Sequence, residues 1–494
     1  MKKCICIFIM LSILFINTGE SFAFTYDFTS GIFNDVESEH WASYPIIQMG
    51  RANIINGFEG KLFKPDDKVT RAQFAKMLLL SADMTPDSMQ RSGFKDMSDQ
   101  HWAKPYAESA KEFFADSISE DYFYPDNSAT RQEVVAAVVR ALKMQDEKVD
   151  ISQLRERFSD FSEIDSKYGK YIAIAVKNGL ISGYPDGTFR PKGKLTRAEA
   201  AKIIYQDIFV KQPVASVNGK EIPFRDFLYK ADKEETYLKA IYGQDMWTLP
   251  TVDSIKAKAL KNILDSTIYD SLLLYKAHEM NIKPTTFEVN TDYDNYVKEM
   301  GGEHYIRKKL LSEADVSDYI KDRIKIKKVL DRIKNQTVTE EEIRHFYNSN
   351  RDNYEYRTIS HIYISNLKRT DAEAVKLAAE VSQKAKSGQD FYQLKGTYCE
   401  ELTDKNDYMY EFKRGTREKL FEDIVFSLSV NQVSNPIKTS YGYYIVKVLE
   451  KNYYSYDSVK EQIKKELNFS KNYSVMLQTI EQWFKEAEIK ININ

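Results

Sequence analysis

One template of fixed internal spacing occurs three times in the first 200 residues, and it constrains the fold of this chain more than any other feature. Each copy has the pattern Phe-x-Pro, followed by a Thr-Arg pair whose arginine lies six residues after the proline. The copies are Phe63–Arg71, Phe123–Arg131 and Phe189–Arg197. They recur after 60 and then 66 residues, and such a period indicates a tandem array of small units that pack on their neighbours.

Each Thr-Arg pair also predicts the start of a helix. The threonine is followed three residues later by Gln or Glu, which is the pattern of a capping box. The boxes are Thr70–Gln73, Thr130–Glu133 and Thr196–Glu199. The arginine inside each box is unexpected, because a cation in the first turn opposes the helix dipole by about 0.3–1 kcal/mol. Three identical exceptions indicate that the guanidinium and the helix N-terminus face an anion together.

These repeats resemble the modules of the S-layer homology family, which attach secreted bacterial proteins to a cell-wall polysaccharide. The resemblance implies three pseudo-symmetric helical modules, at residues 24–88, 89–150 and 151–211. It also implies that an acidic, often pyruvylated, secondary cell-wall polysaccharide binds in the grooves between them. The arginines of the three boxes would be ligand cations: Arg71, Arg131 and Arg197.

The same resemblance assigns two further kinds of glycan contact. An aspartate in a preceding Phe-x-Asp pattern would hydrogen-bond glycan or module backbone, and a tryptophan would stack on sugar; these residues are Asp35, Asp96, Asp160, Trp41 and Trp102. The alternatives are aspartates that only cap backbone and tryptophans that only fill the core. The second copy lacks the Asn-Gly…Gly loop and the third lacks the tryptophan, so the number of grooves that bind stays open.

The N-terminus reads as a secretory signal at residues 1–23. Two lysines precede the apolar run Cys4–Ile16, and Ser21 and Ala23 give small residues at a cleavage site. The run is shorter than the ~20 residues of a membrane helix, so we expect no membrane span after cleavage. The expected location is the cell wall or S-layer of a Gram-positive-type bacterium.

Composition excludes several other classes of site and partner. Cys399 is the only cysteine after the signal, so we expect no disulfide framework and no Cys-rich metal site. His278, His304 and His345 are scattered over predicted helices, so we expect no other metal site, and we expect no cofactor. Lys plus Arg (71) nearly balance Asp plus Glu (73), whereas binding of nucleic acid requires an excess of positive charge. We therefore expect no nucleic-acid partner.

The second half begins with a helical region. Val214–Ile222 contains an Asn-Gly turn between two short strand patterns, and helical spacing follows in Val252–Met280, Thr286–Met300 and Val316–Asn335. Thr339 opens a further capped helix. These patterns resemble the chaperone domain of PrsA-type and SurA-type secreted foldases, at residues 212–352. The alternative is a generic helical bundle.

The next 95 or so residues have the strand, helix and strand patterns of another domain. Arg357–Ile364 predicts a strand, Ala372–Ser387 a long amphipathic helix, and Thr439–Val446 a final strand. Together with Phe421–Leu428, these patterns resemble a parvulin (PpiC-type) prolyl isomerase domain at residues 353–451. In the resembling foldases a C-terminal helix, here residues 452–494, returns to the helical domain. The expected fold is therefore multidomain and mostly α: a three-module array, a helical chaperone domain and an inserted α+β parvulin domain.

The chemistry of that family requires shape and polarity rather than a nucleophile. Rotation about an X-Pro bond crosses a barrier of about 18–20 kcal/mol set by amide resonance, and a site lowers it by favouring the twisted amide over the planar one. The resemblance assigns the polar positions to His361, Glu401, Thr439 and Tyr444. It assigns the proline pocket to Met409, Phe412, Arg417, Phe421 and Phe426.

Two of these residues depart from the family pattern. Tyr444 replaces the second histidine, and a tyrosine hydroxyl can still donate and accept a hydrogen bond. Arg417 replaces a pocket methionine and places charge beside an apolar pocket. His361 has a structural role as its alternative, and for Cys399 we expect packing only.

Three functions compete. The first is a wall-anchored prolyl isomerase that acts on unfolded or folding exported proteins. The second is a wall-bound chaperone of the same architecture whose parvulin domain is degenerate, as Tyr444 and Arg417 favour. The third is a structural subunit of a surface layer.

Overall fold

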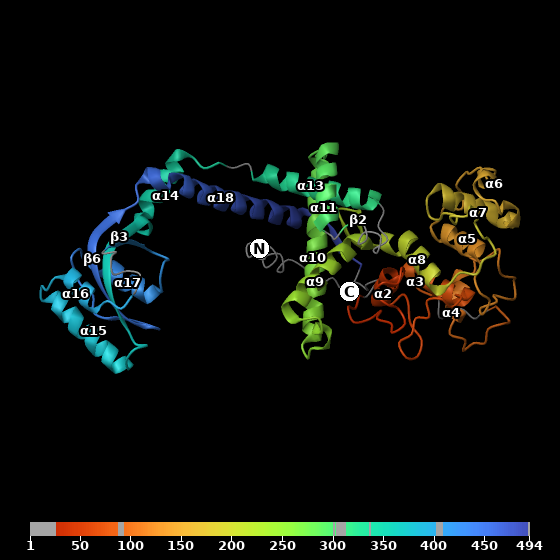
Figure 1. Cartoon of the computed structure of the whole chain (residues 1–494). Helices are drawn as coiled ribbons and strands as arrows, with labels where there is room; N and C mark the ends of the chain where they lie inside the picture. The colour runs from red at the N-terminus through yellow and green to blue at the C-terminus, as the bar shows by residue number, and fades with distance from the viewer. Residues whose placement is uncertain are drawn as a thin grey trace. The chain divides into compact units, whose positions relative to one another are not determined.

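The computed structural model describes residues 26–86, 93–299, 302, 313–334, 337–401 and 409–492 (Figure 1). The predicted signal, residues 1–23, lies outside the described residues. The chain divides into two compact units. Unit 1 comprises residues 1–332 and 477–494, and unit 2 comprises residues 333–476.

Three successive helix pairs, one for each predicted module, form the first part of unit 1. They are α2 (Ser43–Arg51) with α3 (Arg71–Ser81), α4 (Lys104–Ala110) with α5 (Arg131–Ala141), and α7 (Ser166–Lys177) with α8 (Arg197–Asp207). The short helices α6 (Gln153–Arg157), η1 (Phe161–Glu163) and η2 (Phe209–Lys211) complete this part. The three predicted capping boxes are present at the starts of α3, α5 and α8.

The Phe-x-Pro pattern anchors each module. Its phenylalanine is fully buried in all three copies. The next residue has a left-handed backbone, with φ of 59° at Lys64, 56° at Tyr124 and 58° at Arg190. A non-glycine residue in this conformation needs support from its surroundings, and it turns the chain towards the following helix.

Backbone hydrogen bonds join the three modules into a closed ring. The first two N–H groups of α3 donate to carbonyls of the second module, those of α5 to the third, and those of α8 to the first. The donor–acceptor pairs are Arg71–Asn127, Ala72–Pro125, Arg131–Gly193, Gln132–Pro191, Arg197–Asp67 and Ala198–Pro65. The sequence predicted an anion at these helix N-termini. The structure instead places protein carbonyls there, which satisfy N–H groups that a helix cannot pair internally.

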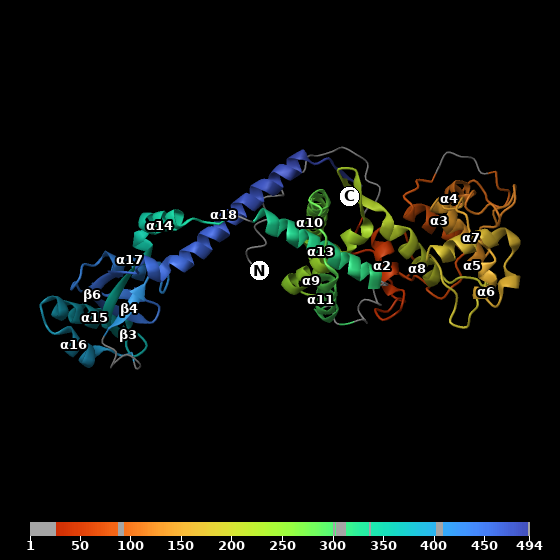
Figure 2. The same cartoon turned by 90° about the horizontal axis from the view of Figure 1, so that it is seen from above.

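The rest of unit 1 is a small sheet with long helices. Strands β1 (Pro213–Val217), β2 (Lys220–Pro223) and β7 (Ile489–Ile491) form an antiparallel sheet in the order β2-β1-β7. The helices are α9 (Phe224–Tyr242), η3 (Met246–Thr248), α10 (Val252–Glu279), α11 (Thr286–Glu299) and α13 (Glu313–Ile333). Figure 2 shows α9 beside α10. No helix of the described ranges is long and apolar enough to cross a membrane.

The first module is fastened to α9 by buried polar and aromatic contacts. The Arg51 guanidinium donates two hydrogen bonds to Glu235, at 2.9 and 3.0 Å. Such a two-point ion pair fixes orientation as well as distance. Tyr44 donates to Asp232 at 2.8 Å, so polar side chains join the first module to α9 within unit 1.

Unit 2 is a four-stranded antiparallel sheet with helices on both faces. The strands are β3 (Glu355–Ser365), β4 (Tyr410–Lys413), β5 (Ile437–Thr439) and β6 (Gly442–Tyr453), in the order β4-β3-β6-β5. Helices α15 (Asp371–Lys386) and α16 (Phe391–Tyr398) pack on one face, and α17 (Lys419–Ser427) packs on the other. Helix α14 (Glu340–Ser349) and η4 (Arg351–Tyr354) lead into β3.

One long helix carries the chain back from unit 2. Helix α18 (Tyr456–Glu486) begins after β6, and its last turns belong to unit 1. Beyond it, Ile491 of β7 pairs with Ala215 of β1. The mostly helical, multidomain fold expected from the sequence is confirmed.

Candidate functional site

Two neighbouring strands of unit 2 hold the candidate active site. His361 lies on β3 and Tyr444 on β6, on the face of the sheet that α17 covers. Residues two apart on a strand share a face, so Ile359, His361 and Tyr363 line up towards Tyr444. The rings of His361 and Tyr444 are 5.2 Å apart.

Both nitrogens of the buried His361 ring are engaged. Nε2 lies 2.6 Å from Oε2 of Glu401, and Nδ1 lies 3.1 Å from the hydroxyl of Tyr410. A carboxylate can only accept, so Nε2 carries a proton in this geometry. In the neutral ring Nδ1 then accepts from Tyr410. The arrangement orients His361 and leaves Glu401, which is partly exposed, at the edge of the site.

Arg417 covers the aromatic surface of the site. Its guanidinium lies over the ring of Tyr444, 4.8 Å from the centroid, and over Phe421 at 5.1 Å. Burial acts to lower the pKa of Arg417, but a hydrogen bond with the Tyr444 hydroxyl and the charge of Glu401 raise it overall. Arg417 is therefore a cation held on the two rings.

The pKa of Tyr444 also depends on Arg417 and Glu401. Burial raises the pKa of its hydroxyl, and the charge of Glu401 adds to this, whereas the hydrogen bond with Arg417 opposes it. Tyr444 therefore stays protonated and can donate a hydrogen bond at neutral pH.

The pocket aromatics form one cluster. Phe421 packs edge-on against both Phe412, at 5.6 Å, and Tyr444, at 5.6 Å. The rings of Phe426 and Phe412 lie 5.8 Å apart. Met409 is exposed on the chain just before β4. Phe421 and Tyr444 thus form an apolar platform that is buried, with 3 % and 8 % of their surface exposed. Arg417 covers both rings, so a ligand reaches the platform only when this side chain moves aside.

Thr439 lies at the end of β5 and has a local bond. Its hydroxyl donates to the carbonyl of Gly442 at 3.0 Å, which closes the turn between β5 and β6.

Sequence reasoning missed Tyr410, the partner of His361. Strand alternation from Phe412 would have placed Tyr410 on the same face, but the start of β4 was not evident from the sequence.

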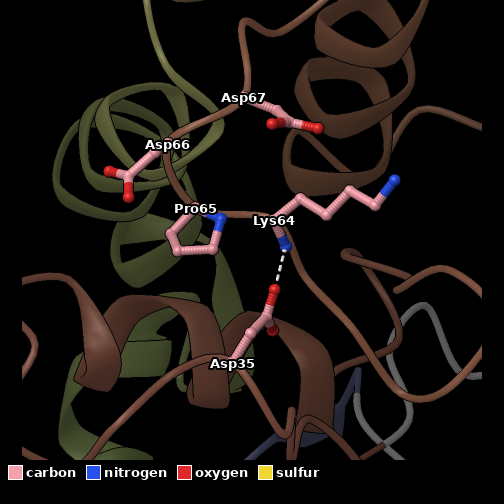
Figure 3. Close-up of a pocket in the computed structure, with 5 residues that line it drawn as sticks. All are labelled: Asp35, Lys64, Pro65, Asp66 and Asp67. Atoms are coloured by element: carbon pink, nitrogen blue, oxygen red, sulfur yellow. Dashed lines mark hydrogen bonds between the residues drawn. The ribbon is translucent and has the colours of Figure 1, made fainter.

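The aspartates of the module array bind backbone. Asp35 accepts from the N–H groups of Phe63 and Lys64, both at 2.7 Å, and Figure 3 shows the bond to Lys64. Asp96 and Asp160 hold their own Phe-x-Pro segments in the same way. These bonds support the left-handed residue in each module, as the capping alternative predicts. Beside Asp35 lies a pocket of about 400 Å³, also lined by Lys64, Asp66 and Asp67.

The three arginines differ in their surroundings. Arg71 is buried and donates to Glu133 at 2.7 Å, with a second bond to the carbonyl of Phe123. Arg197 is also buried and donates to the carbonyl of Phe63 and to Gln73. Arg131 is partly exposed and donates to the carbonyl of Ser182 at 2.7 Å. Each therefore reaches into the next module of the ring.

The two tryptophans lie on the surface. Trp41 is 48 % exposed and Trp102 is 52 % exposed. Each stacks on the histidine before it, at 5.5 Å for His40 and 5.9 Å for His101. The core alternative is thus excluded by their exposure, and both rings are accessible to a ligand.

Two known domain families match the chain. The S-layer homology domain matches residues 32–75 and 157–201. The PPIC-type PPIASE domain matches residues 341–452.

Curated relatives match the part of the chain that follows the modules. The foldase protein PrsA of Clostridium botulinum (strain Langeland) is 26% identical over 308 residues, in a match that covers 57% of this chain and 88% of that protein. The PrsA of Caldanaerobacter subterraneus is 28% identical over 289 residues, 56% of this chain and 86% of that protein.

Solved structures of similar proteins cover the same share of the chain. The peptidylprolyl isomerase PrsA from Bacillus cereus is 24% identical and covers 57% of this chain and 94% of its own, with a TM-score of 0.28. PrsA from Bacillus subtilis is 21% identical and covers 56% of this chain and 94% of its own, with a TM-score of 0.18.

Proposed function

We propose that this chain, which carries S-layer homology domains and a PPIC-type peptidyl-prolyl isomerase domain, is a foldase attached to the bacterial cell wall. Its unit 2 assists cis/trans isomerisation of X-Pro bonds in exported proteins. The observation that carries this proposal is the platform of Phe421 and Tyr444 beside the hydrogen-bonded His361.

Each part of that site has a task in the proposed reaction. The platform receives the apolar proline ring. Twisting the amide returns a lone pair to the prolyl nitrogen, and a donor facing that nitrogen stabilises the twisted state more than the planar one. Tyr444 is the donor we assign. His361, bonded to Glu401 and Tyr410, holds its ring against Tyr444 and so acts as a positioning residue.

Arg417 favours a second reading, that of a chaperone with a weakened isomerase site. Its guanidinium occupies the face of the platform that a proline ring needs. Displacing it loses two cation–π contacts, each worth about 0.5–1 kcal/mol at exposed sites. A loss of about 1–2 kcal/mol lowers the rate roughly 5–30-fold. Activity should therefore be reduced rather than absent.

A groove of about 910 Å³ between α9 and α10 supports the chaperone part of the proposal. Its apolar rim includes Tyr237, Ile241 and Tyr242, each about half exposed. Lysines line it as well, among them Lys233 and Lys258. We assign this groove to apolar segments of non-native exported proteins.

The module array is the proposed anchor. Its surface carries the partly exposed Arg131 and two exposed tryptophans, which together suit an acidic polysaccharide. We propose residues 24–88, 89–150 and 151–211 as the three modules, 212–352 as the chaperone domain, 353–451 as the inserted isomerase domain and 452–494 as the returning segment.

Refolding of a client whose slow phase is limited by proline isomerisation tests the enzymatic claim. We expect the intact chain to accelerate that phase at a molar ratio well below one. Suppression of aggregation alone, and only at equimolar chain, would support the chaperone reading and contradict catalysis. Phe421→Ala serves as the control that removes the platform.

A further inference from the structure

A third aromatic ring extends the platform of the candidate site. Tyr363 of β3 pairs with Tyr444 of β6, and the centroids of their rings are 4.8 Å apart. The ring of Tyr444 in turn lies 5.6 Å from that of Phe421. The three rings therefore form a series in which Tyr444 contacts both of the others.

Tyr363 is the ring of this series that a ligand can reach without a rearrangement. Phe421 and Tyr444 are buried and lie under Arg417, whereas Tyr363 is partly exposed. A client segment can therefore contact the ring of Tyr363 while Arg417 still covers the platform.

Several contacts hold the ring of Tyr363 in place. Its hydroxyl donates to the carbonyl of Tyr441 at 2.6 Å, and its N–H donates to Sγ of Cys399 at 3.5 Å. Its carbonyl accepts from the N–H of Glu400 at 2.9 Å. Gly442 leaves room for the ring, since a Cβ there would lie only 3.0 Å from Cε2 of Tyr363. A side chain held in this way loses little conformational freedom when a ligand binds to it.

Two strongly exposed apolar side chains lie at the same end of the sheet. Leu367 is 79 % exposed and Tyr441 is 67 % exposed. Leu367 follows β3 and Tyr441 precedes β6, and the N–H of Asn366 donates to the carbonyl of Tyr441 at 3.1 Å. Together with Tyr363, they give this end of unit 2 an apolar surface beside the platform, and exposed apolar surface of this kind marks binding sites.

The distance between the rings suits the residues of an extended peptide. Such a chain advances about 3.3 Å per residue, and the ring of Tyr363 lies 4.8 Å from that of Tyr444. With the proline on the platform, the side chain of the residue directly before or directly after it therefore reaches Tyr363.

We propose that Tyr363, Leu367 and Tyr441 form a subsite that binds a large apolar side chain directly next to the proline of a client segment. The inference rests on the proposed isomerase function and names the class of X-Pro segment that its site selects. Tyr363 is the specificity-determining residue, because its ring contacts that of Tyr444. Large apolar side chains are mostly buried in folded proteins, so the subsite also favours clients that have not yet folded.

The test measures kcat/KM of the mature full-length chain on three proline peptides. One peptide has glutamine on both sides of the proline, and the other two carry leucine at only the preceding or only the following position. Catalysed cis/trans exchange is followed by NMR, so that no peptide has to suit a protease. We expect kcat/KM to be roughly fivefold higher for one of the two leucine peptides, because partial burial of leucine stabilises the bound peptide.

Two double variants separate the subsite from the rest of unit 2. The test variant is Leu367→Gln/Tyr441→Gln. The matched control is Val430→Gln/Phe469→Gln, which replaces apolar side chains that are 46 % and 54 % exposed, in the segment after α17 and on α18. All four side chains are exposed, and substitutions at such positions change stability little, so both variants should fold.

The decisive quantity is the ratio of kcat/KM for the preferred leucine peptide to that for the glutamine peptide. We expect the test variant and Tyr363→Ala to bring this ratio to within twofold of one. Tyr363→Phe, which keeps the ring, and the control should keep the wild-type ratio. Damage to the fold would instead lower kcat/KM on all peptides and leave the ratio unchanged.

Two results would overturn the subsite while the isomerase function stands. They are a wild-type ratio near one for both leucine peptides, and a ratio that the test variant and Tyr363→Ala leave unchanged. A wild-type chain that accelerates exchange in none of the three peptides would overturn the isomerase function and the subsite with it.

Discussion

At the scale of single residues, Arg417 decides how active the isomerase site can be. The family resemblance placed it at the pocket, and the structure sets its guanidinium over Phe421 and Tyr444. We predict that Arg417→Met raises kcat/KM on neutral X-Pro peptides roughly 5–30-fold, because the platform becomes free. A protease-coupled peptide assay measures this.

Arg414→Met is the matched control. Arg414 comes from the same loop, but its guanidinium lies over Phe426, at 4.1 Å. Its replacement should leave kcat/KM unchanged. If Arg417→Met also changes nothing while Phe421→Ala abolishes activity, then Arg417 does not obstruct the platform.

A buried carboxyl at the end of α8 makes the stability of unit 1 depend on pH. Burial raises the pKa of Asp207 to about 7, with Lys211 opposing the rise. The folded state holds this proton more tightly than the unfolded chain, so the stabilisation is full below about pH 4 and is lost as pH rises through about 7. Asp207→Asn should therefore stabilise unit 1 by about 1–3 kcal/mol at pH 8 and much less at pH 4.

Chemical denaturation at the two pH values measures this difference, and the pH 4 value is the control. A stabilisation of equal size at both pH values would show that Asp207 acts through packing rather than through its charge.

The role of a residue could be predicted where its partner is near in the sequence. It could not be predicted where the partner is far away in the sequence. The capping boxes lie within three residues and were read correctly from the sequence. The aspartate that supports each Phe-x-Pro segment lies 27 to 29 residues before it, 28 in the case of Asp35 and Phe63, and the sequence left its role open. Tyr410 was not predicted, because no residue near it in the sequence marks it as the partner of His361.

At the scale of elements, the closed ring explains why an arginine occupies the first turn of α3, α5 and α8. The helix N–H groups donate to carbonyls of the next module, and the guanidinium donates to another carbonyl of that same module. The sequence predicted the helices but not this ring, because the carbonyls that close it come from another module.

The buried ion pair of Arg71 and Glu133 should therefore contribute more to stability than the partly exposed contact of Arg131. We predict that Arg71→Ala destabilises the array by about 3–5 kcal/mol, because it leaves Glu133 buried without its partner. Arg131→Ala should cost less than about 1.5 kcal/mol, because Arg131 is partly exposed and donates to a carbonyl. Urea unfolding followed by tryptophan fluorescence measures both, since Trp41 and Trp102 lie in the array. Equal effects would mean that Glu133 is not held by Arg71.

At the scale of the whole molecule, the last strand ties the end of the chain to unit 1. β7 pairs with β1, the N–H of Asn218 donates to Glu488, and that of Asn492 donates to Val214. The sequence predicted a returning helix from a family resemblance. It gave no sign of the third strand, because three residues are too few for a strand pattern.

Removal of residues 488–494 tests whether β7 stabilises unit 1. We predict a lower melting temperature for unit 1 and an unchanged transition for unit 2, because only the β2-β1-β7 sheet loses a strand. Differential scanning calorimetry resolves the two transitions. If unit 1 melts as before, β7 does not stabilise it.

The central claim is that one chain both anchors to the wall and isomerises prolines, and co-sedimentation of activity tests it most directly. Mature chain is mixed with protein-free walls and centrifuged, and X-Pro isomerase activity is assayed in the pellet and in the supernatant, with the Arg417→Met variant in parallel to raise the signal. The account predicts activity in the pellet with native walls, and in the supernatant when the carboxylates of the walls are amidated. Activity that stays in the supernatant with native walls, or a pelleted Arg417→Met chain without activity, would contradict it.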